Sequence, residues 1–550
     1  MREIASLRKS IAAIVAGLAS CAVLQPVYAS QSAPATATPI KHLVVIFQEN
    51  ISFDHYFATY PVAKNPAGEP EFHALPETPS VNGLTGLLLT NNPNATSPAN
   101  STPNLKVNAA FNPFRLDRSE ASTNDQDHDY TPEQEAFDFG LMDAFPASVG
   151  TAGPPPAGGP PASTQALTMG YYDGNTVTAY WNYAQRYALS DNSYGTNFGP
   201  STDGAINLIS GQTNGVIDDM NSGGSTISDG NGGLTLISDA DPNGDVCSTT
   251  SGETLSFSGK NIGDLLSAAN VTWGFFEGGF DLTRVNANKS TGCNRSTTST
   301  VTNTLKADYI PHHEPFQYYA STANPKHTRP KELNTIGTNA DPANHQYDIH
   351  DFFDAVTAGT FPAVSYLKAP GFQDGHAGYS DPLDEQNFVV TVINFLQQQP
   401  DWSSTAVIIA YDDSDGWYDH VAGPIVNQSA TAADQNAKGT AMCGTGSGAL
   451  PGINPATKHA QGRCGFGPRL PLLVISPWAR QNFVDHTLTD QSSILRFVED
   501  NWLAGKRLGA GSFDTITNSL NNMFDFNARS PENTGRLFLN PSSGEVEGSN

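Results

Sequence analysis

The stretch IKHLVVIFQENISFDHYF, residues 40–57, changes character abruptly at its middle. Leu43 to Phe47 form an apolar and largely β-branched run, which predicts a buried strand. Glu49 and Asn50 follow at once. Because sites in open α/β sheets form beyond the carboxyl ends of strands, Glu49 and Asn50 are candidate ligands in such a site.

A second strand ends in the same way. The stretch AVIIAYDDSDGWYDH, residues 406–420, runs from apolar residues into Asp412 and Asp413. Carboxylate and amide oxygens delivered by two strand ends suit a divalent cation, whose identity among Ca, Mg, Mn, Fe and Zn stays open. The alternative for Asp412 and Asp413 is an ordinary surface turn, which DDSDG also resembles.

The rest of the chain indicates the fold class. Further strand-like runs occupy 271–276, 363–367 and 471–476, and helix-like stretches lie near 175–188, 384–399 and 491–503. Short buried strands alternating with helices predict an α/β fold with a central, mostly parallel sheet flanked by helices. We expect one domain over 40–550 with long loop insertions near 60–125, 210–305 and 425–465, preceded by a flexible segment at 30–39.

The N-terminus has the pattern of a secretory signal. A basic start precedes the apolar run from Ile11 to Leu24, and the small residues of VYAS at 27–30 suggest cleavage after Ala29. We therefore expect residues 1–29 to be a signal peptide and the protein to be periplasmic or secreted. Lipidation at Cys21, within LASC, is the less favoured alternative.

The cysteine count agrees with export. Four cysteines remain beyond the signal: Cys247, Cys293, Cys443 and Cys464. An even number in an exported protein favours two disulfides, although the sequence does not fix which of three pairings forms. We expect 247–293 and 443–464, because each pair closes a loop rich in Gly, Ser and Thr. No pair has the C-x2-C spacing of a zinc site.

Length and charge limit the classes of molecule that the protein is expected to bind. The 550 residues carry 28 basic and 54 acidic side chains, a net charge of -26. This balance argues against nucleic acid or an anionic membrane as a tight partner. No stretch beyond the signal approaches 18 apolar residues, so we expect no transmembrane segment. The oligomeric state stays open.

A hydroxyl nucleophile is suggested by YGTNFGPSTDGAINLISG, residues 194–211. The Gly199-Pro200 turn precedes Ser201, and the following run can start a helix. A hydroxyl at a helix N-terminus lies among unpaired backbone N–H groups, which favour an alkoxide and an incoming phosphate. The alternative is that Ser201 serves only as the helix N-cap, the commoner role of such a serine.

Histidines in polar, turn-rich segments complete the inventory. His128 lies in NDQDHDYTPEQEAFD, the pair His312 and His313 in YIPHHEPFQYY, and His376 in GFQDGHAGYSDPLDEQ. A hydroxyl nucleophile, bound cations and imidazoles together suit phosphoryl transfer. A serine protease fits poorly, because there is no G-x-S-x-G motif and the paired acids would be unexplained.

Seven ordered segments between residues 40 and 505 give the chain a resemblance to a known family. They are HLVVIFQENISFDHYF, FGPSTDGAINLISG, YIPHHEPFQYY, GHAGYSDPLDEQNFV, VIIAYDDSDGWYDHV, GFGPRLPLLVISPWA and DHTLTDQSSILRFVEDNW. They resemble the secreted bacterial phosphoesterases that include phospholipases C and acid phosphatases.

That resemblance implies a core like that of alkaline phosphatase and arylsulfatase. It implies a divalent metal ion held by Glu49, Asn50, Asp412 and Asp413, and a nucleophile, Ser201, that is transiently phosphorylated. It also implies that His128, His376 and one of the pair His312 and His313, preferably His313, hold the phosphoryl group or protonate the leaving oxygen.

Two departures from the family pattern bear on the substrate. Many phospholipase members have Thr after Gly-Pro, where this chain has Ser201, and many read YDEHGG where this chain reads YDDSDG. Both departures resemble the acid phosphatase branch, so the expected function is an exported, metal-dependent acid phosphatase acting on small phosphate monoesters. Phospholipase C activity on phospholipid head groups ranks second, and a non-enzymatic calcium-binding surface protein third.

Overall fold

The structure is a computed structural model that describes residues 35–101, 112–150, 165–220, 223–440, 442–444, 461–527 and 536–549. All of these residues fall within one compact unit, 34–550. The proposed signal peptide and the alternative lipidation site at Cys21 lie outside the described residues, as does the first half of the segment 30–39.

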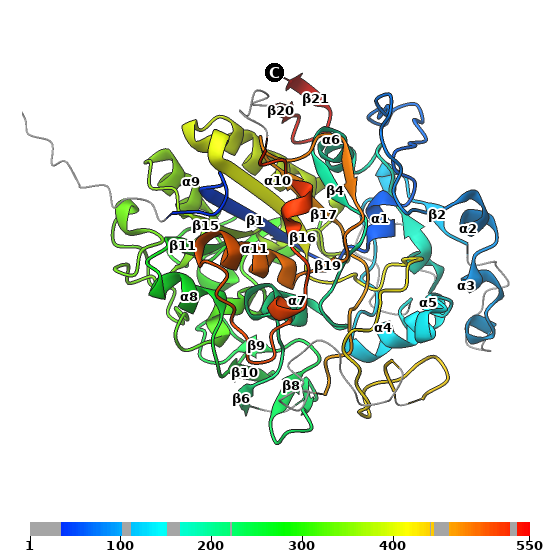
Figure 1. Cartoon of the computed structure of the whole chain (residues 1–550), viewed down its shortest axis with the longest axis horizontal. Coiled ribbons are helices and arrows are strands. Elements are labelled where there is room, and N and C mark those ends of the chain that lie inside the picture. The colour runs from blue at the N-terminus through cyan, green and yellow to red at the C-terminus, as the bar shows by residue number, and fades with distance from the viewer. Residues whose placement is uncertain are drawn as a thin grey trace, which may run out of the picture. The chain divides into compact units, whose positions relative to one another are not determined.

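An eight-stranded sheet forms the core (Figure 1). Its order is β14 (Gln346–Asp348), β11 (Trp273–Glu277), β15 (Val364–Lys368), β1 (His42–Gln48), β16 (Thr405–Tyr411), β17 (Leu472–Ile475), β4 (Ala188–Ser190) and β18 (Phe483–Asp485). β17 pairs antiparallel with β16 and β4, and the other pairs in this sheet are parallel. The predicted α/β fold with a mostly parallel sheet is confirmed.

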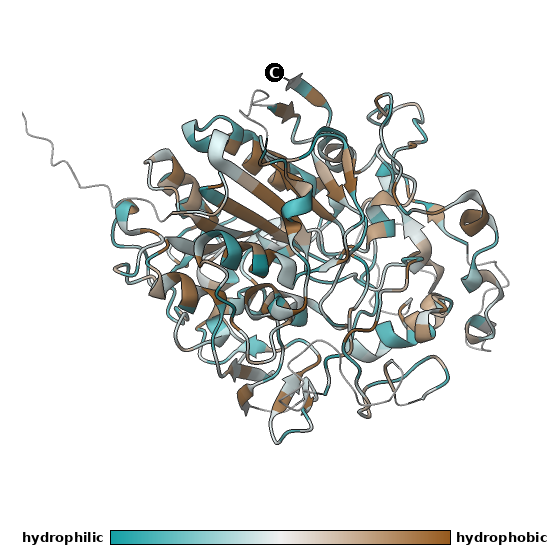
Figure 2. Cartoon of the chain, viewed as in Figure 1, coloured by the Kyte–Doolittle hydropathy of each residue, from teal (hydrophilic) through white to brown (hydrophobic). Residues whose placement is uncertain are grey.

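The central strands explain why the sequence pattern is continuous rather than alternating. Every residue of β16 is buried, and so is every residue of β1 after His42. A strand covered on both faces needs apolar side chains on both, so it loses the period-two pattern of a half-exposed strand. Figure 2 shows these strands as the brown, hydrophobic centre of the unit.

Two groups of helices flank the sheet. Helix α6 (Thr178–Arg186) packs against α10 (Pro382–Gln397), while α7 (Ser201–Ser210) packs against α8 (Ile262–Ala268) and α11 (Ser492–Trp502). In Figure 1 the strands run between these groups. The helices predicted near 175–188, 384–399 and 491–503 correspond to α6, α10 and α11, and this part of the prediction is confirmed.

Small sheets occupy the long insertions. Between α7 and α8 lie the three-stranded sheet of β6 (Val216–Met220), β10 (Thr254–Phe257) and β9 (Asp241–Pro242), and the hairpin of β7 (Thr226–Ser228) and β8 (Leu234–Leu236). A second hairpin, β12 (Ser296–Thr298) and β13 (Leu305–Ala307), follows β11. Among the described residues, no helix has the length and apolar character needed to cross a bilayer.

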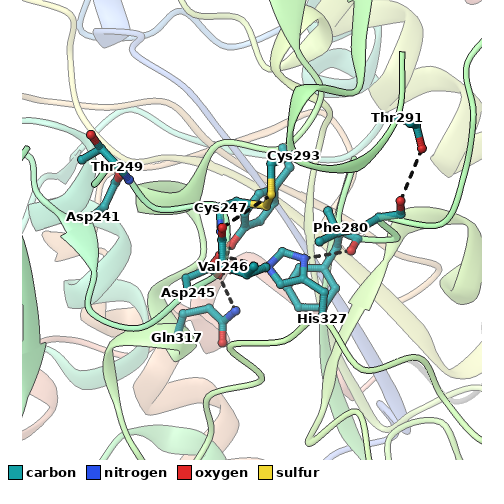
Figure 3. The surroundings of a disulfide bond; sticks show 12 residues. Asp241, Asp245, Val246, Cys247, Thr249, Phe280, Thr291, Cys293, Gln317 and His327 are labelled. Carbon is teal, nitrogen blue, oxygen red and sulfur yellow. Dashed lines mark hydrogen bonds and ion pairs between the residues drawn. A yellow bond between two sulfur atoms is a disulfide. The ribbon is translucent and has the colours of Figure 1, made fainter. Parts of the chain in front are cut away.

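Both predicted disulfides are present, Cys247–Cys293 and Cys443–Cys464. The first lies beside a buried polar cluster centred on Asp245 (Figure 3). The Asp245 carboxylate accepts hydrogen bonds from Gln317 Nε2 at 2.6 Å and the Tyr309 hydroxyl at 2.8 Å, and lies 3.0 Å from His327 Nε2. These contacts satisfy the buried carboxylate, so the cluster holds the insertion in place.

Candidate active site

Three neighbouring strands end at one edge of the sheet and deliver charged side chains there. β1 is followed by Glu49 and Asn50, β16 by Asp412 and Asp413, and β15 ends at Lys368. β1 lies between the other two, with Gln48 in register with Tyr411. All five side chains are buried, at 2% exposure or less. The surface-turn alternative for Asp412 and Asp413 is therefore wrong.

Ser201 faces these strand ends. Its Oγ lies 2.9 Å from Glu49 Oε2, 3.1 Å from Asp413 Oδ2 and 3.4 Å from Asn50 Oδ1. A hydroxyl has one proton, so it can donate to only one of these three oxygens. The four oxygen atoms, with too few protons between them, form a donor set that suits a divalent cation, and three of the four predicted metal ligands, Glu49, Asn50 and Asp413, contribute to it.

Ser201 is not the helix N-cap. Pro200 holds that position with extended backbone angles, and Ser201 is the first residue of α7. No side-chain cap bond forms there, because the side chain of proline has no acceptor atom, and the Ser201 hydroxyl points to Glu49 and Asp413. The N-cap alternative is wrong, and the hydroxyl lies at the positive end of the helix dipole.

Gly204 permits this approach of helix to sheet. A Cβ atom at Gly204 would lie 2.2 Å from the carbonyl oxygen of Asp412, well inside contact distance. The first turn of α7 therefore lies directly against the end of β16. The end of β1 also has a conformational requirement. Asn50 adopts a φ of 62°, which asparagine tolerates better than most residues.

Asp412 and Lys368 form the floor of the site. Asp412 Oδ1 accepts the backbone N–H groups of Asn50 at 2.9 Å and Asp413 at 2.7 Å, which fixes both strand ends relative to each other. Lys368 Nζ contacts Glu49 Oε1 and lies 3.3 Å from Asp412 Oδ2. The Lys368 ammonium thus contacts two of the three buried carboxylates, those of Glu49 and Asp412, and leaves Asp413 to other partners.

The two adjacent histidines separate. His313 Nε2 lies 3.4 Å from Glu49 Oε1, whereas His312 Nδ1 lies 3.6 Å from Asp241 Oδ1 in the insertion. The structure thus places His313, the preferred member of the pair, beside the strand ends. Burial lowers the pKa of His313 well below its ordinary value, and the charge of Lys368 adds to this effect. His313 is therefore neutral at neutral pH.

His128 and His376 come from loops and meet on the other side of Asn50. Their ring centroids are 5.7 Å apart, and His128 Nε2 lies 3.3 Å from Asn50 Nδ2. Burial acts to lower the pKa of His128, but the carboxylates of Asp413, Asp415 and Asp125 outweigh it and raise that pKa well above its ordinary value. Burial lowers the pKa of His376.

Two carboxylates near Ser201 differ in basicity. Burial would raise the pKa of Glu49, but the neighbouring His313 imidazole and the Lys368 ammonium hold it well below its ordinary value. Burial raises the pKa of Asp413 to about 7, and the charge of Glu49 acts in the same direction. Asp413 is therefore the better proton acceptor for the Ser201 hydroxyl.

Several residues of the site escaped the sequence prediction. Lys368 ends the strand predicted at 363–367, so the strand-end reasoning applied to Glu49 could have found it. Asp374, Tyr379 and Asp415 stand in the motifs quoted for their histidines and aspartates. Lys306 lies in an insertion, where no local pattern connects it with the site.

Three groups of His, Cys, Asp and Glu in the described part of the chain bring ligand atoms within 4.8 Å of one another. One contains Cys247, which is disulfide-bonded. A second, with Asp54 and Asp419, is paired with Arg469 Nη2 at 3.0 and 3.1 Å. The third consists of Asp125, His128, His376 and Asp415 and borders the strand ends directly.

Fold and site together define a class, an α/β protein with a serine hydroxyl held among carboxylates at the ends of parallel strands. The chain belongs to the Phosphoesterase family, whose model matches residues 40–504.

Curated relatives agree with this assignment. The chain is 24% identical over 520 residues to a non-hemolytic phospholipase C of Pseudomonas aeruginosa, covering 91% of this chain and 60% of the relative. It is 26% identical to the corresponding protein of Burkholderia pseudomallei, covering 90% and 60%. With phospholipase C A of Mycobacterium tuberculosis it shares 24% identity, covering 86% and 75%. The chain thus spans about 60% of the length of the first two relatives.

Solved structures with some similarity include a protein of the alkaline phosphatase superfamily from Vibrio parahaemolyticus. Its TM-score is 0.26 at 12% identity, covering 60% of this chain and 62% of that one. Murine ectonucleotide pyrophosphatase/phosphodiesterase 5 in complex with AMP has a TM-score of 0.30 at 10% identity, covering 64% and 94%.

Proposed function

We propose that the chain hydrolyses phosphate esters through a phosphorylated Ser201. The observation that carries this proposal is the Ser201 hydroxyl within 2.9 to 3.4 Å of three oxygens at two strand ends. In the first step Oγ attacks phosphorus, its proton passes to Asp413, and the ester oxygen leaves. Water then attacks the phosphoserine, which releases phosphate or the phosphorylated head group and restores the hydroxyl.

The histidines divide the remaining roles. His128 is protonated at neutral pH and faces the amide of Asn50, so two N–H donors, His128 Nε2 and Asn50 Nδ2, lie 3.3 Å apart. An oxygen of the phosphoryl group that lies beside the pair, about 3 Å from each nitrogen, accepts from both. His128 also has the proton that the leaving oxygen needs. His313 and His376 are neutral and contact the phosphoryl group as hydrogen-bond partners.

Glu49, Asn50, Asp412 and Asp413 would hold a divalent cation together with Ser201. Such an ion lowers the pKa of the attacking hydroxyl and neutralises charge that develops on phosphorus. Asp412 contributes mainly by position, because its Oδ1 already accepts two backbone N–H groups. The identity of the metal is left open by an all-oxygen donor set.

For the substrate, phospholipid head-group diesters take first place. The support is the agreement of relatives from three bacterial genera, all of which carry phospholipase C names. This ranking reverses the expectation from the sequence, which placed monoesters first. Small phosphate monoesters are the second candidate, on the evidence of Ser201 and YDDSDG in place of the residues frequent in phospholipase members.

The decisive experiment compares p-nitrophenyl phosphorylcholine with p-nitrophenyl phosphate for the purified protein and for Ser201→Ala. We expect turnover of the diester by the wild-type protein and loss of turnover of both compounds in the variant. Exclusive turnover of the monoester would restore the acid phosphatase ranking. Unchanged hydrolysis by the variant would contradict the mechanism, and an absence of any hydrolysis would favour the calcium-binding alternative.

We also propose that the protein works outside the cytoplasm. The support is the two disulfides, which persist in oxidising compartments, together with the signal-like pattern of residues 1–29. Fractionation of cells that express the full chain, with the fractions blotted for the protein, tests this proposal. Recovery in the cytoplasmic fraction alone would contradict it.

A further inference from the structure

The hairpin of β12 and β13 reaches the edge of the active site. Lys306 is the middle residue of β13, in the hairpin with β12 that follows β11. β13 packs against the short helix Gly371–Gln373, which lies between β15 and the segment that carries Asp374 and His376. The Lys306 Cγ would lie 3.0 Å from a Cβ at Gly371, so the contact between hairpin and loop is close.

The ammonium of Lys306 lies over an aromatic ring beside the catalytic histidines. Its Nζ is 3.5 Å from the centroid of the Tyr379 ring, a short cation–π contact. The imidazole of His376 stacks on the same ring with centroids 4.3 Å apart and planes 24° apart. Both distances are too short for the two groups to share one face of the ring. Lys306 therefore occupies one face and His376 the other.

The position of Tyr379 is tied to the strand ends. Its hydroxyl donates to Asp374 Oδ2 at 3.2 Å, and the backbone oxygen of Asp374 accepts the N–H of Glu49 at 2.9 Å. Lys306 lies in the field of three carboxylates, those of Asp374, Glu49 and Asp125. Burial lowers the pKa of Lys306, while these carboxylates favour its charged form.

This arrangement bears on substrate charge. A quaternary ammonium head group is bound in proteins by open aromatic faces, onto which its positive charge can settle. Here the face of Tyr379 that His376 leaves open is already covered by a cation of the protein itself. A second cation brought to that face would meet like charge, whereas an additional negative charge on the substrate would meet an ammonium.

We propose that Lys306 is a specificity-determining residue, which makes the site prefer substrates with a second negative charge near the phosphorus over substrates with a choline head group. This inference rests on the proposed function and refines its substrate class. The favoured charge can come from a monoester dianion or from a diester whose head group is anionic, and the two sources share the same chemistry at Lys306.

The test uses Lys306→Met, which keeps the length of the side chain and removes the charge. Lys331→Met is the matched control, because Lys331 is an exposed lysine. For each protein we measure kcat/KM with p-nitrophenyl phosphate, with p-nitrophenyl phosphorylcholine and with a phosphodiester whose head group carries a carboxylate. We expect Lys306→Met to shift the ratio of anionic to choline substrate at least about tenfold toward choline, and the control to leave it within about twofold.

The two anionic substrates distinguish the sources of charge. If the loss falls on p-nitrophenyl phosphate, Lys306 senses the second charge of the monoester; if it falls on the carboxylated diester, Lys306 senses the head group. Lys306→Arg, which keeps the cation, should retain the wild-type ratio. Equal changes of all three substrates in Lys306→Met, as a merely structural role would give, would overturn the proposal.

A measurement without turnover separates this inference from the proposed function. Isothermal titration of inorganic phosphate and of free choline into the wild-type protein and Lys306→Met compares the two kinds of charge directly. We expect the variant to lose affinity for phosphate relative to choline by a similar factor. Hydrolysis that survives in Ser201→Ala would contradict the mechanism and leave this comparison valid, whereas an unchanged ratio of affinities would overturn the role of Lys306 alone.

Discussion

The two halves of the active site are held in different ways. Glu49, Asn50, Asp412 and Asp413 extend from the two central strands and are buried at 2% exposure or less. On the other side, His128 and His376 lie on loops and Lys306 on a two-stranded hairpin. The first half is part of the core, whereas the second is attached to it.

This difference indicates which residues carry out the reaction and which select the substrate. The strand ends cannot move without disturbing the sheet, so they suit the atoms that must meet at phosphorus. Loops and hairpins tolerate change without loss of the core, so they suit the residues that select a substrate. Two side chains that reach the site from the loops are also more exposed, Asp125 at 39% and His128 at 12%.

The largest effect is expected at the point where both halves meet. Ser201→Ala removes the nucleophile and should lower kcat by a factor on the order of 10⁴ or more. The fold should persist, since the lost hydroxyl is replaced by a smaller apolar group. Steady-state kinetics and circular dichroism measure the two quantities. Ser210→Ala is the control at the other end of α7, where the hydroxyl contacts the backbone oxygens of Ile206 and Gln212 and the side chain of Tyr319, and it should keep nearly full activity.

Substitution of Lys368, beside the strand ends, should lower the free energy of unfolding. Lys368→Met leaves the buried carboxylates of Glu49 and Asp412 without their ammonium, and breaking a buried pair in this way typically costs about 3–5 kcal/mol. A divalent cation at the same oxygens would offset part of that loss. Urea unfolding with added metal and with chelator measures both values. We expect the larger loss of unfolding free energy in chelator, and an equal loss in both conditions would argue against a cation at these carboxylates.

Sequence reasoning succeeded for the first half of the site and only partly for the second. A buried strand that ends in Glu49 and Asn50 is a local pattern, and the sheet brings such ends together whatever the loops do. The hydrogen bonds of Ser201 depend instead on how α7 packs against the strand ends. The sequence around Ser201 fits an N-cap as well as a nucleophile, so it does not predict these contacts. Lys306 lies 73 positions before Tyr379, and its contact with that ring exists only in the folded chain.

Short strands at and near the edges of the sheet were also not predicted. β14, β4 and β18 have three residues each, too few for a periodic pattern to stand out from the surrounding loops. The antiparallel direction of β17 could not be predicted either, because an apolar run has no direction in the sequence. Neither omission affected the site, since both concern strands other than β15, β1 and β16.

The half of the site that lies on loops should determine how the catalytic rate depends on pH. His128→Asn should lower kcat about 10²-fold, within the range for loss of a general acid. Asp413, with a pKa of about 7, must be deprotonated to accept the Ser201 proton, so the wild-type rate should rise through neutral pH. Because the pKa of His128 is raised well above its ordinary value, the rate should fall again as the pH rises through that raised pKa. A pH–rate profile measures this alkaline fall, which should be absent in the variant.

The same linkage affects stability. Protonated His128 stabilises the folded state below the ordinary histidine pKa, and this contribution is lost as the pH rises through its raised folded pKa. The melting temperatures of wild type and His128→Asn should therefore converge at alkaline pH. A difference that grows with pH would contradict the assignment of a protonated His128.

The smallest change tests how closely the first half is assembled. Gly204→Ala adds one methyl group, whose carbon would lie 2.2 Å from the carbonyl oxygen of Asp412. Helix α7 must then shift away from β16 and carry Ser201 with it, although alanine itself favours a helix by about 1 kcal/mol over glycine. We expect about a tenfold loss in kcat and little change in KM.

Gly86→Ala, at the start of helix Gly86–Thr90, has open space around the new methyl group. It should leave the kinetics unchanged and serves as the control for Gly204→Ala. The activity of Gly204→Ala depends on how rigid the strand ends are. If the end of β16 could shift, it would relieve the clash and Ser201 would stay in place. Full activity in Gly204→Ala would thus show that the core half of the site is as adaptable as the loops, and the contrast between the two halves would fail.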